Sequence, residues 1–271
     1  MLIAQISDTH IKPELTRPDG RPTTRELMQR AVEQLIALRS RPDVVLVTGD
    51  CTDHGTPEEV AIFHTLLAPL PMPVFVIPGN HDQRATLRAR FGAQGTQATT
   101  DFMQYVIEDF PVRLIALDTV IPGSDAGELC AARLQWLDNR LREAPATPTL
   151  VFQHHPPFDT GLDVLDALGL KGREAQGRVL ARHPQVQRVV AGHIHCAMQQ
   201  RFHGTLAMTA PSTALNIAIE RAEPNKLWAS LEPAGILLHH WSTRAGLVSH
   251  LMPIPSPALG PLIHDGVDWR L

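Results

Sequence analysis

Short apolar runs alternate with segments of helical hydrophobic spacing along most of the chain. The runs are three to five residues long and are mostly bounded by polar residues, Gly or Pro, which is typical of buried strands. An alternation of such strands with helices indicates an α/β layered fold. The runs are Leu2 to Ile6, Val44 to Val47, Val74 to Ile77, Leu114 to Leu117, Leu150 to Phe152 and Val186 to Val190.

Two of the predicted helices begin with N-capping signals. Thr23 and Glu26 have the spacing of a capping box. Thr56 is followed by Pro57 at the first helical position and by Glu59 three residues on. Apolar residues at helical spacing follow both starts and mark two further helices: Leu27, Ala31, Leu35 and Leu38; Val60, Phe63 and Leu67; Leu134, Leu137 and Leu141; Ala175 and Val179.

The pattern changes after Cys196. Leu206 to Met208, Ile236 to His240 and Leu247 to Met252 are strand-like, and we expect them to form a second, antiparallel sheet portion. Residues 253–271 are rich in Pro and Gly and predict an irregular extension on the body or on a partner subunit. A length of 271 residues leaves no room for a large second domain, so residues 1–252 are expected to form one catalytic domain.

Composition narrows the class of protein. Apolar residues make up 44% of the chain and charged residues 19%, as in ordinary globular proteins. A net charge of -4 argues against an extended nucleic acid as partner, and no apolar run reaches the roughly 20 residues that cross a bilayer. Cys51, Cys130 and Cys196 are scattered, and the N-terminus lacks the basic start of a signal peptide, so we expect a cytoplasmic protein.

Polar clusters follow five of the predicted strands. The carboxyl ends of the strands at one edge of an α/β sheet form the ligand-binding rim, so clusters that are far apart in sequence should meet there. Carboxylate, imidazole and amide groups together suit Fe, Mn, Zn or Co, whereas Ca or Mg favours oxygen ligands alone. The clusters are Asp8-Thr9-His10, Gly49-Asp50, Gly79-Asn80-His81-Asp82, His154-His155 and Gly192-His193-Ile194-His195.

Spacing within the clusters supports the metal site. An extended backbone at Asp8-x-His10 and His193-x-His195 would point both side chains of each pair to the same side. A glycine precedes three of the candidate ligands, where it allows a tight turn or the close approach of another group. Each cluster alone is most often a turn or a pair of surface histidines. Together, in this order and at strand ends, they predict a metal centre.

These motifs resemble the calcineurin-like metallophosphoesterase superfamily over residues 1 to about 211. Ile77-Pro78-Gly79-Asn80-His81-Asp82 and His154-His155-Pro156-Pro157 are most similar to bacterial class III cyclic nucleotide phosphodiesterases and related glycerophosphodiesterases. The resemblance implies a four-layer αββα sandwich of two mixed sheets flanked by helices. It also implies two divalent or trivalent metal ions (Fe, Mn, Zn or Co), with Asp8, His10 and His195 on one, Asn80, His154 and His193 on the other, and Asp50 bridging both.

The implied activity is hydrolysis of a small phosphodiester, a cyclic nucleotide or a glycerophosphodiester, by a metal-bound hydroxide. Family members are commonly oligomeric, so a homo-oligomer is expected. Asn80 and His81 are the expected catalytic and substrate-binding residues, and Asn216 is a further substrate contact. His81 is expected to protonate the leaving oxygen or stabilise the transition state, and the alternative is that it orients Asp50 or Asn80.

Other residues have weaker signals. His155 is expected to orient the loop behind His154, and Asp53 and His54 are interpreted as a solvated turn. Leu215 stands where the glycerophosphodiesterases have a histidine, which argues against glycerol-type substrates. We expect His239, His240, His250 and His264 to be structural or surface residues.

Alternative functions remain at the level of sequence. A pyrophosphatase or a phosphomonoesterase of the same superfamily is one class. The superfamily's protein phosphatases carry an arginine where His54 stands, and its absence favours diesters. A metal-binding scaffold without activity is the other class, and the complete set of seven ligands argues against it.

Overall fold

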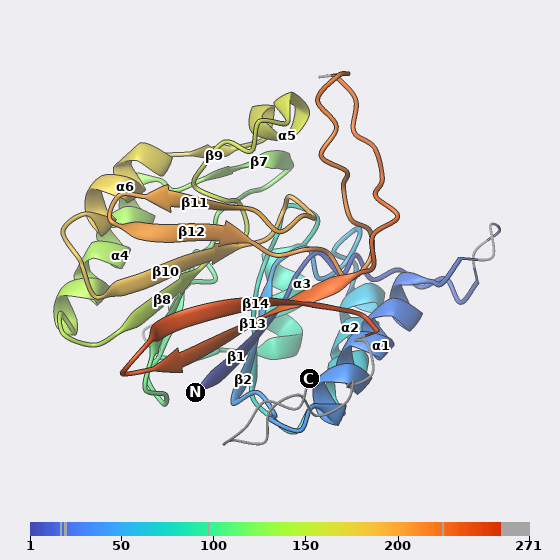
Figure 1. The fold of residues 1–271 in the computed structure, drawn as a ribbon, viewed down its shortest axis with the longest axis horizontal. Coiled ribbons are helices and arrows are strands. Elements are labelled where there is room, and N and C mark those ends of the chain that lie inside the picture. Colours follow the sequence, from blue (N-terminus) through green and yellow to red (C-terminus); the bar gives the residue numbers. More distant parts are fainter. Residues whose placement is uncertain (17, 19–20, 97, 224, 256–271) are drawn as a thin grey trace, which may run out of the picture.

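Two mixed β-sheets form the centre of the structure (Figure 1). The computed structural model describes residues 1–16, 18, 21–96, 98–223 and 225–255. The first sheet has the strand order β14-β13-β1-β2-β3 and the second the order β11-β12-β10-β8-β5-β4. The first contains β1 (Leu2–Ile6), β2 (Val44–Thr48), β3 (Val74–Ile77), β13 (Gly235–Ser242) and β14 (Gly246–Pro253), and the second β4 (Tyr105–Ile107), β5 (Arg113–Ala116), β8 (Thr149–Phe152), β10 (Val186–Ala191), β11 (Gln199–Phe202) and β12 (Thr205–Thr209).

Three further strands, β6 (Val120–Ile121), β7 (Ser124–Glu128) and β9 (Leu170–Lys171), form a small separate sheet. Helices cover the outer face of each of the two large sheets. The helices are α1 (Thr24–Ala37), α2 (Pro57–Leu67), α3 (Arg84–Phe91), α4 (Ala131–Glu143), α5 (Asp163–Ala167) and α6 (Arg173–Leu180).

Alternating side chains of the central strands build three apolar cores. Ile3, Leu46 and Phe152 belong to the core between the two sheets. Their strand neighbours point the other way, so Ala4 and Val45 pack with α1, α2 and α3, and Val151 packs with α4 and α6. These cores separate four layers, which confirms the expected αββα sandwich.

Most of the strands and helices predicted from local patterns are present. β1 and β3 have the predicted bounds, and the capping boxes at Thr23 and Thr56 are both formed. The predicted strand at Leu114 to Leu117 begins and ends one residue earlier than expected. Of the predicted extension at residues 253–271, only residues 253–255 are among the described residues.

The expected antiparallel sheet after Cys196 is wrong as a separate unit. β13 and β14 do pair antiparallel, but β13 also pairs with β1 and so extends the first sheet. β12 joins the second sheet, parallel to β10 and antiparallel to β11. Local patterning identifies these segments as strands but not their partners, and in the fold β13 pairs with the backbone groups that the β1 edge would otherwise leave open.

We expect Thr56→Ala to destabilise the protein by about 1 kcal/mol, because it removes one half of a capping box. The Thr56 hydroxyl accepts a hydrogen bond from the Glu59 amide, and the Glu59 carboxylate accepts one from the Thr56 amide. Urea denaturation measures the change in the free energy of unfolding. Thr56→Ser keeps the hydroxyl and serves as the control, and equal stability of the two variants would contradict the capping role.

Candidate metal centre

The structure brings all seven predicted ligands to one edge shared by the two large sheets. β1, β2 and β3 run parallel in the first sheet, and β8 and β10 run parallel in the second. The loops that leave their carboxyl ends therefore meet in space. They carry Asp8 and His10 after β1, Asp50 after β2, Asn80 after β3, His154 after β8, and His193 and His195 after β10.

Asp8, His10, Asp50 and His195 form one half of the site. The Nε2 atoms of His10 and His195 lie 3.1 Å apart. His195 Nε2 is 3.5 Å from an Asp8 carboxylate oxygen, and His10 Nε2 is 3.6 Å from Asp50 Oδ2. Four potential ligand atoms thus lie within 4.8 Å of one another.

Asn80, His154 and His193 form the other half. Asn80 Oδ1 lies 3.0 Å from His154 Nε2 and 3.1 Å from His193 Nδ1. His154 Nε2 is also 3.4 Å from Asp50 Oδ2. The same Asp50 oxygen therefore faces both halves, which is the position that a bridging carboxylate needs.

Hydrogen bonds behind the site fix the orientation of three imidazoles. His10 Nδ1 donates to Asp53 (3.2 Å), His154 Nδ1 donates to the Thr48 carbonyl (2.8 Å), and His195 Nδ1 donates to the Leu215 carbonyl (2.6 Å). In the neutral rings the lone pair then sits on Nε2, which faces the site in each case.

When the rings are neutral, nitrogen lone pairs and oxygen acceptors thus face one another at several contacts. The His10 and His195 lone pairs are directed at each other at 3.1 Å, and His154 Nε2 faces two oxygen acceptors. Such contacts repel unless a positive charge lies among them. The donor set of imidazole nitrogens, carboxylates and an amide oxygen fits cations such as Fe, Mn, Zn or Co.

The pKa shifts of the rings show that positive charge is favoured at His154 and disfavoured at His193. Burial alone would lower the pKa of His154, but the Asp50 charge and hydrogen bond raise it to about 9. The pKa of Asp50 is held well below its usual range, since His154, His10 and His81 outweigh the effect of burial. Burial and the neighbouring His155 and His154 lower the pKa of His193.

The backbone of the ligand loops differs from the extended form expected from the sequence. Asp8, His10, His193 and His195 have φ values of 52°, 40°, 69° and 53°, and Asp50 has 47°. Non-glycine residues with such left-handed φ cost of order 1–3 kcal/mol each and occur where the surroundings enforce them. The two residues of each pair therefore face one site through local turns and not through a strand.

Two glycines allow the loops to approach as closely as they do. A Cβ on Gly79 would lie 2.1 Å from Asp50 Oδ1, and one on Gly192 would lie 2.1 Å from Ser7 Oγ. Both distances are far below van der Waals contact, so only glycine fits. This agrees with the close approach expected where a glycine directly precedes a candidate ligand.

Two acidic residues beside the ligands have roles that the sequence did not reveal. The buried Asp82 carboxylate accepts from the amides of Cys51, Thr52 and Gly79 and so joins the loops of Asp50 and Asn80. Asp53 accepts from His10 and from Lys12 (2.9 Å), and these bonds lower its pKa although burial opposes them. A solvated turn was the wrong interpretation for Asp53, but His54 is largely exposed.

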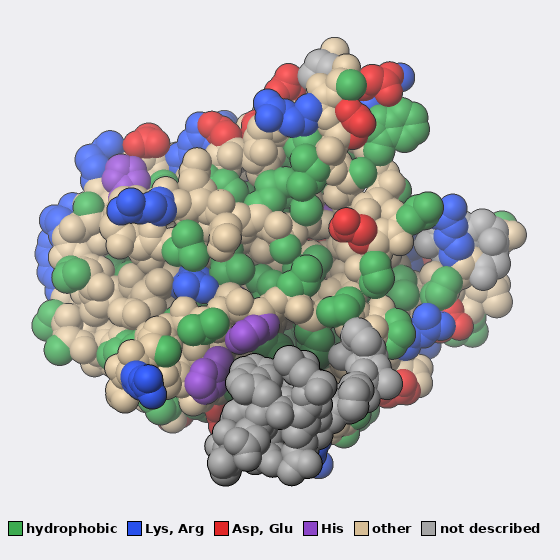
Figure 2. All heavy atoms as spheres, in the orientation of Figure 1, with side chains coloured by type: hydrophobic (Ala, Val, Ile, Leu, Met, Phe, Trp, Pro, Cys, Tyr) green, Lys and Arg blue, Asp and Glu red, His purple; other side chains and the backbone are tan. Residues whose placement is uncertain are grey.

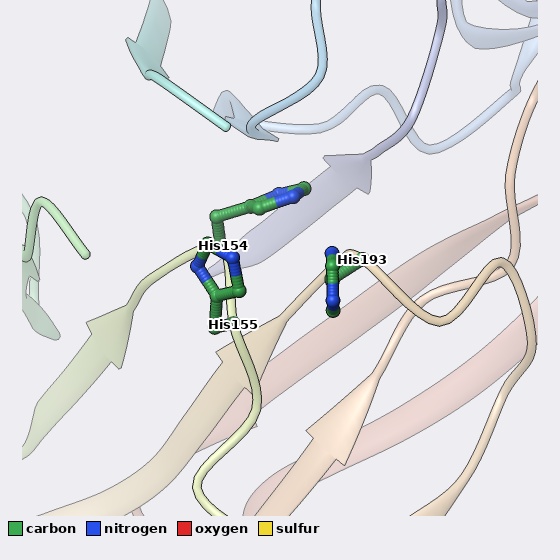
Figure 3. Close-up of side chains that lie close together, drawn as sticks. All are labelled: His154, His155 and His193. Atoms are coloured by element: carbon green, nitrogen blue, oxygen red, sulfur yellow. The ribbon is translucent and has the colours of Figure 1, made fainter. Parts of the chain in front are cut away.

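Figure 3 shows the side chains of His154, His155 and His193 close together. The nitrogens of these three rings could hold a metal by distance alone. However, His155 Nδ1 bonds with the Thr119 hydroxyl (2.8 Å) and Nε2 with the Asp125 carbonyl (3.0 Å). Burial and the nearby His154 lower its pKa to about 3, so the ring is neutral and its nitrogens are already engaged.

His81 and Asn216 are both close to the centre. His81 Nδ1 donates to the Asp53 carbonyl at 2.8 Å, and its backbone amide donates to Asp50 at 3.0 Å. Its ring packs edge-on against His10. The Asn216 amide accepts from the Ser212 amide and donates to the Pro233 carbonyl, so it ties its own loop together. The roles of both residues toward substrate stay predictions.

The remaining predicted structural histidines lie away from the centre. His239 is buried and bonds with Gln5 and Ser249, whereas His240 and His250 are exposed on β13 and β14. His264 lies outside the described residues.

Acidic and basic side chains are interspersed on the face shown in Figure 2. Among the described residues, no helix is long and apolar enough to cross a membrane.

The sequence is similar to known phosphoesterases. A family model described as calcineurin-like phosphoesterase matches residues 1–197. The chain is 34% identical over 251 residues to a protein named probable glycerophosphodiester phosphodiesterase GpdQ from Arcobacter nitrofigilis, covering 92% of each chain. It is 29% identical over 245 residues to 3',5'-cyclic adenosine monophosphate phosphodiesterase CpdA from Pseudomonas aeruginosa, covering 88% of each chain.

A solved structure shows the same fold. The dimetal phosphatase from Danio rerio superposes with a TM-score of 0.64 at 16% identity, covering 94% of this chain and 99% of that chain. All seven candidate ligands lie within the matched residues 1–197. The chain therefore belongs to the calcineurin-like phosphoesterase family.

Proposed function

We propose that the chain hydrolyses a small phosphodiester at this centre with the help of two metal ions. The observation that carries the proposal is the convergence of nitrogen lone pairs and carboxylate oxygens around Asp50. Relatives named glycerophosphodiester and cyclic nucleotide phosphodiesterases, similar over most of their length, favour a diester as substrate. Both substrate types are therefore candidates.

The proposed ligands are those that share a half of the site. Asp8, His10 and His195 would hold one ion, Asn80, His154 and His193 the other, and Asp50 both. Iron, manganese, zinc and cobalt fit this donor set. When bound, two such ions polarise the phosphoryl oxygens and make a water nucleophilic at neutral pH.

His81 is the proposed proton donor to the leaving group. In hydrolysis the water oxygen bonds to phosphorus, the ester P–O bond breaks, and the departing oxygen takes a proton. The Asp53 carbonyl accepts from His81 Nδ1 and fixes the ring, which leaves Nε2 to donate when the ring is protonated. Asn80 has the second proposed role of orienting the phosphoryl group, because its amide lies between His154 and His193.

The other functions are less well supported. A scaffold would not need seven side chains held in strained or tightly packed loops. Pyrophosphatase and phosphomonoesterase activity are outcomes that a substrate panel would reveal. We further propose one catalytic domain over residues 1–252, a cytoplasmic location and a homo-oligomeric assembly.

Asn80→Ala is expected to lower turnover of bis-(p-nitrophenyl) phosphate by orders of magnitude and to weaken one of the two metals, because a ligand is lost. Plasma mass spectrometry of the purified variant gives the metal content. Asn139→Ala is the matched control, since Asn139 is exposed on α4. Unchanged kcat and metal content in Asn80→Ala would refute the assignment.

His81→Ala is expected to keep both metals while turnover falls by about 10²–10⁴, the usual range for a lost acid-base group. The fall should be larger for substrates with an alkoxide leaving group than for those that release p-nitrophenolate, which needs no proton. His240→Ala, at an exposed histidine, is the control. An equal fall for both leaving groups would show that His81 is not the proton donor.

A further inference from the structure

A cavity of about 870 Å³ opens directly beside the metal centre. Two of the proposed ligands, His10 and His195, form part of its wall. The loop before α1, the start of α1, the loop between β12 and β13, and Ile254 after β14 supply the rest. Figure 1 shows these two loops, in blue and in orange, projecting from the body. The volume is in the range of pockets that enclose a small organic ligand.

Apolar side chains supply much of the cavity wall. Leu27, Leu215, Leu231 and Ile254 all line it, together with several prolines. Leu231 is 92% exposed and Leu215 is 48% exposed. Leucines left in contact with water beside a binding site gain free energy when a ligand covers them.

The charged side chains of the wall do not favour a highly anionic ligand. Lys12 and Arg21 line the cavity, but so do Glu14 and Glu232, so positive and negative groups balance. Lys12 is also paired with Asp53 at 2.9 Å. A nucleoside carrying additional phosphates would find no excess of positive charge here.

We propose that this cavity selects phosphodiesters in which one ester substituent is a long apolar chain. The inference rests on the proposed function, because the phosphodiester group has to lie at the metal centre for its substituent to enter the cavity. The chain would extend past His10 and His195 and cover Leu27, Leu215 and Leu231. An alkyl or acyl chain meets this requirement, whereas a bare glycerol leaves the leucines exposed.

A series of methyl, butyl and octyl p-nitrophenyl phosphates tests the proposal in the metal-loaded protein. The leaving group is constant, so only contacts of the alkyl chain vary. We expect kcat/KM to rise along the series, by up to about fourfold for each methylene that becomes buried. The rise in kcat/KM should come mainly from a lower KM, because the alkyl chain does not touch the reacting atoms.

Two variants locate the effect. Leu231→Asp should lower the octyl-to-methyl ratio of kcat/KM by at least about tenfold, since it places a charge against the chain. Ile219→Asp should leave the ratio unchanged, because Ile219 is 63% exposed on the same loop but does not line the cavity. The exposure of both side chains makes the substitutions compatible with folding.

Calorimetry with methyl octyl phosphate and dimethyl phosphate gives a readout that does not need turnover. Tighter binding of the octyl diester supports the inference even if no ester is hydrolysed. A lack of hydrolysis of every ester would refute only the proposed function. Hydrolysis of the methyl ester with no dependence on chain length in rate or binding would overturn the inference and leave the proposed function standing.

Discussion

The crowding of electron-pair donors around Asp50 is the constraint on which the rest of the site depends. Three imidazoles are held by their Nδ1 atoms against Asp53, Thr48 and Leu215, so that each turns its Nε2 inward. The Nε2 atoms of His10 and His195 face each other at 3.1 Å, and that of His154 faces the Asn80 amide oxygen at 3.0 Å. A positive charge among these atoms relieves their mutual repulsion. The arrangement is therefore stabilised by a bound cation and destabilised without one.

The fold holds this arrangement by rigid means. Five of the seven ligands have left-handed backbone conformations, and glycines at positions 79 and 192 let the loops interlock. Asp82 joins two of these loops through backbone amides. Beneath them, the core between the sheets fixes the strand ends from which the loops leave. Strain at the site is therefore supported by the most buried part of the molecule.

Local signals in the sequence account for most elements and for the identity of the cluster. β1 and the capping boxes at Thr23 and Thr56 could be predicted because hydrophobic runs and caps act over a few residues. The sheet that each later strand joins could not be predicted, since local patterning does not name the pairing partner: β13 pairs with β1, more than two hundred residues away, whereas β12 pairs with the nearby β10. The strands β6, β7 and β9 were not predicted because they have only two to five residues and no clear apolar pattern.

Within the site, residue types were predictable but conformations were not. A left-handed φ at His10 or His193 arises from the loops packed around it, and the bond from His10 to Asp53 forms only once the loop after β2 has folded back.

The most direct test is anomalous X-ray scattering from crystals of the metal-loaded protein, recorded at the Mn, Fe, Co and Zn edges. We predict two peaks about 3.5–4 Å apart on either side of Asp50. No peak there, or a single ion bound away from Asp50, would contradict a two-metal centre.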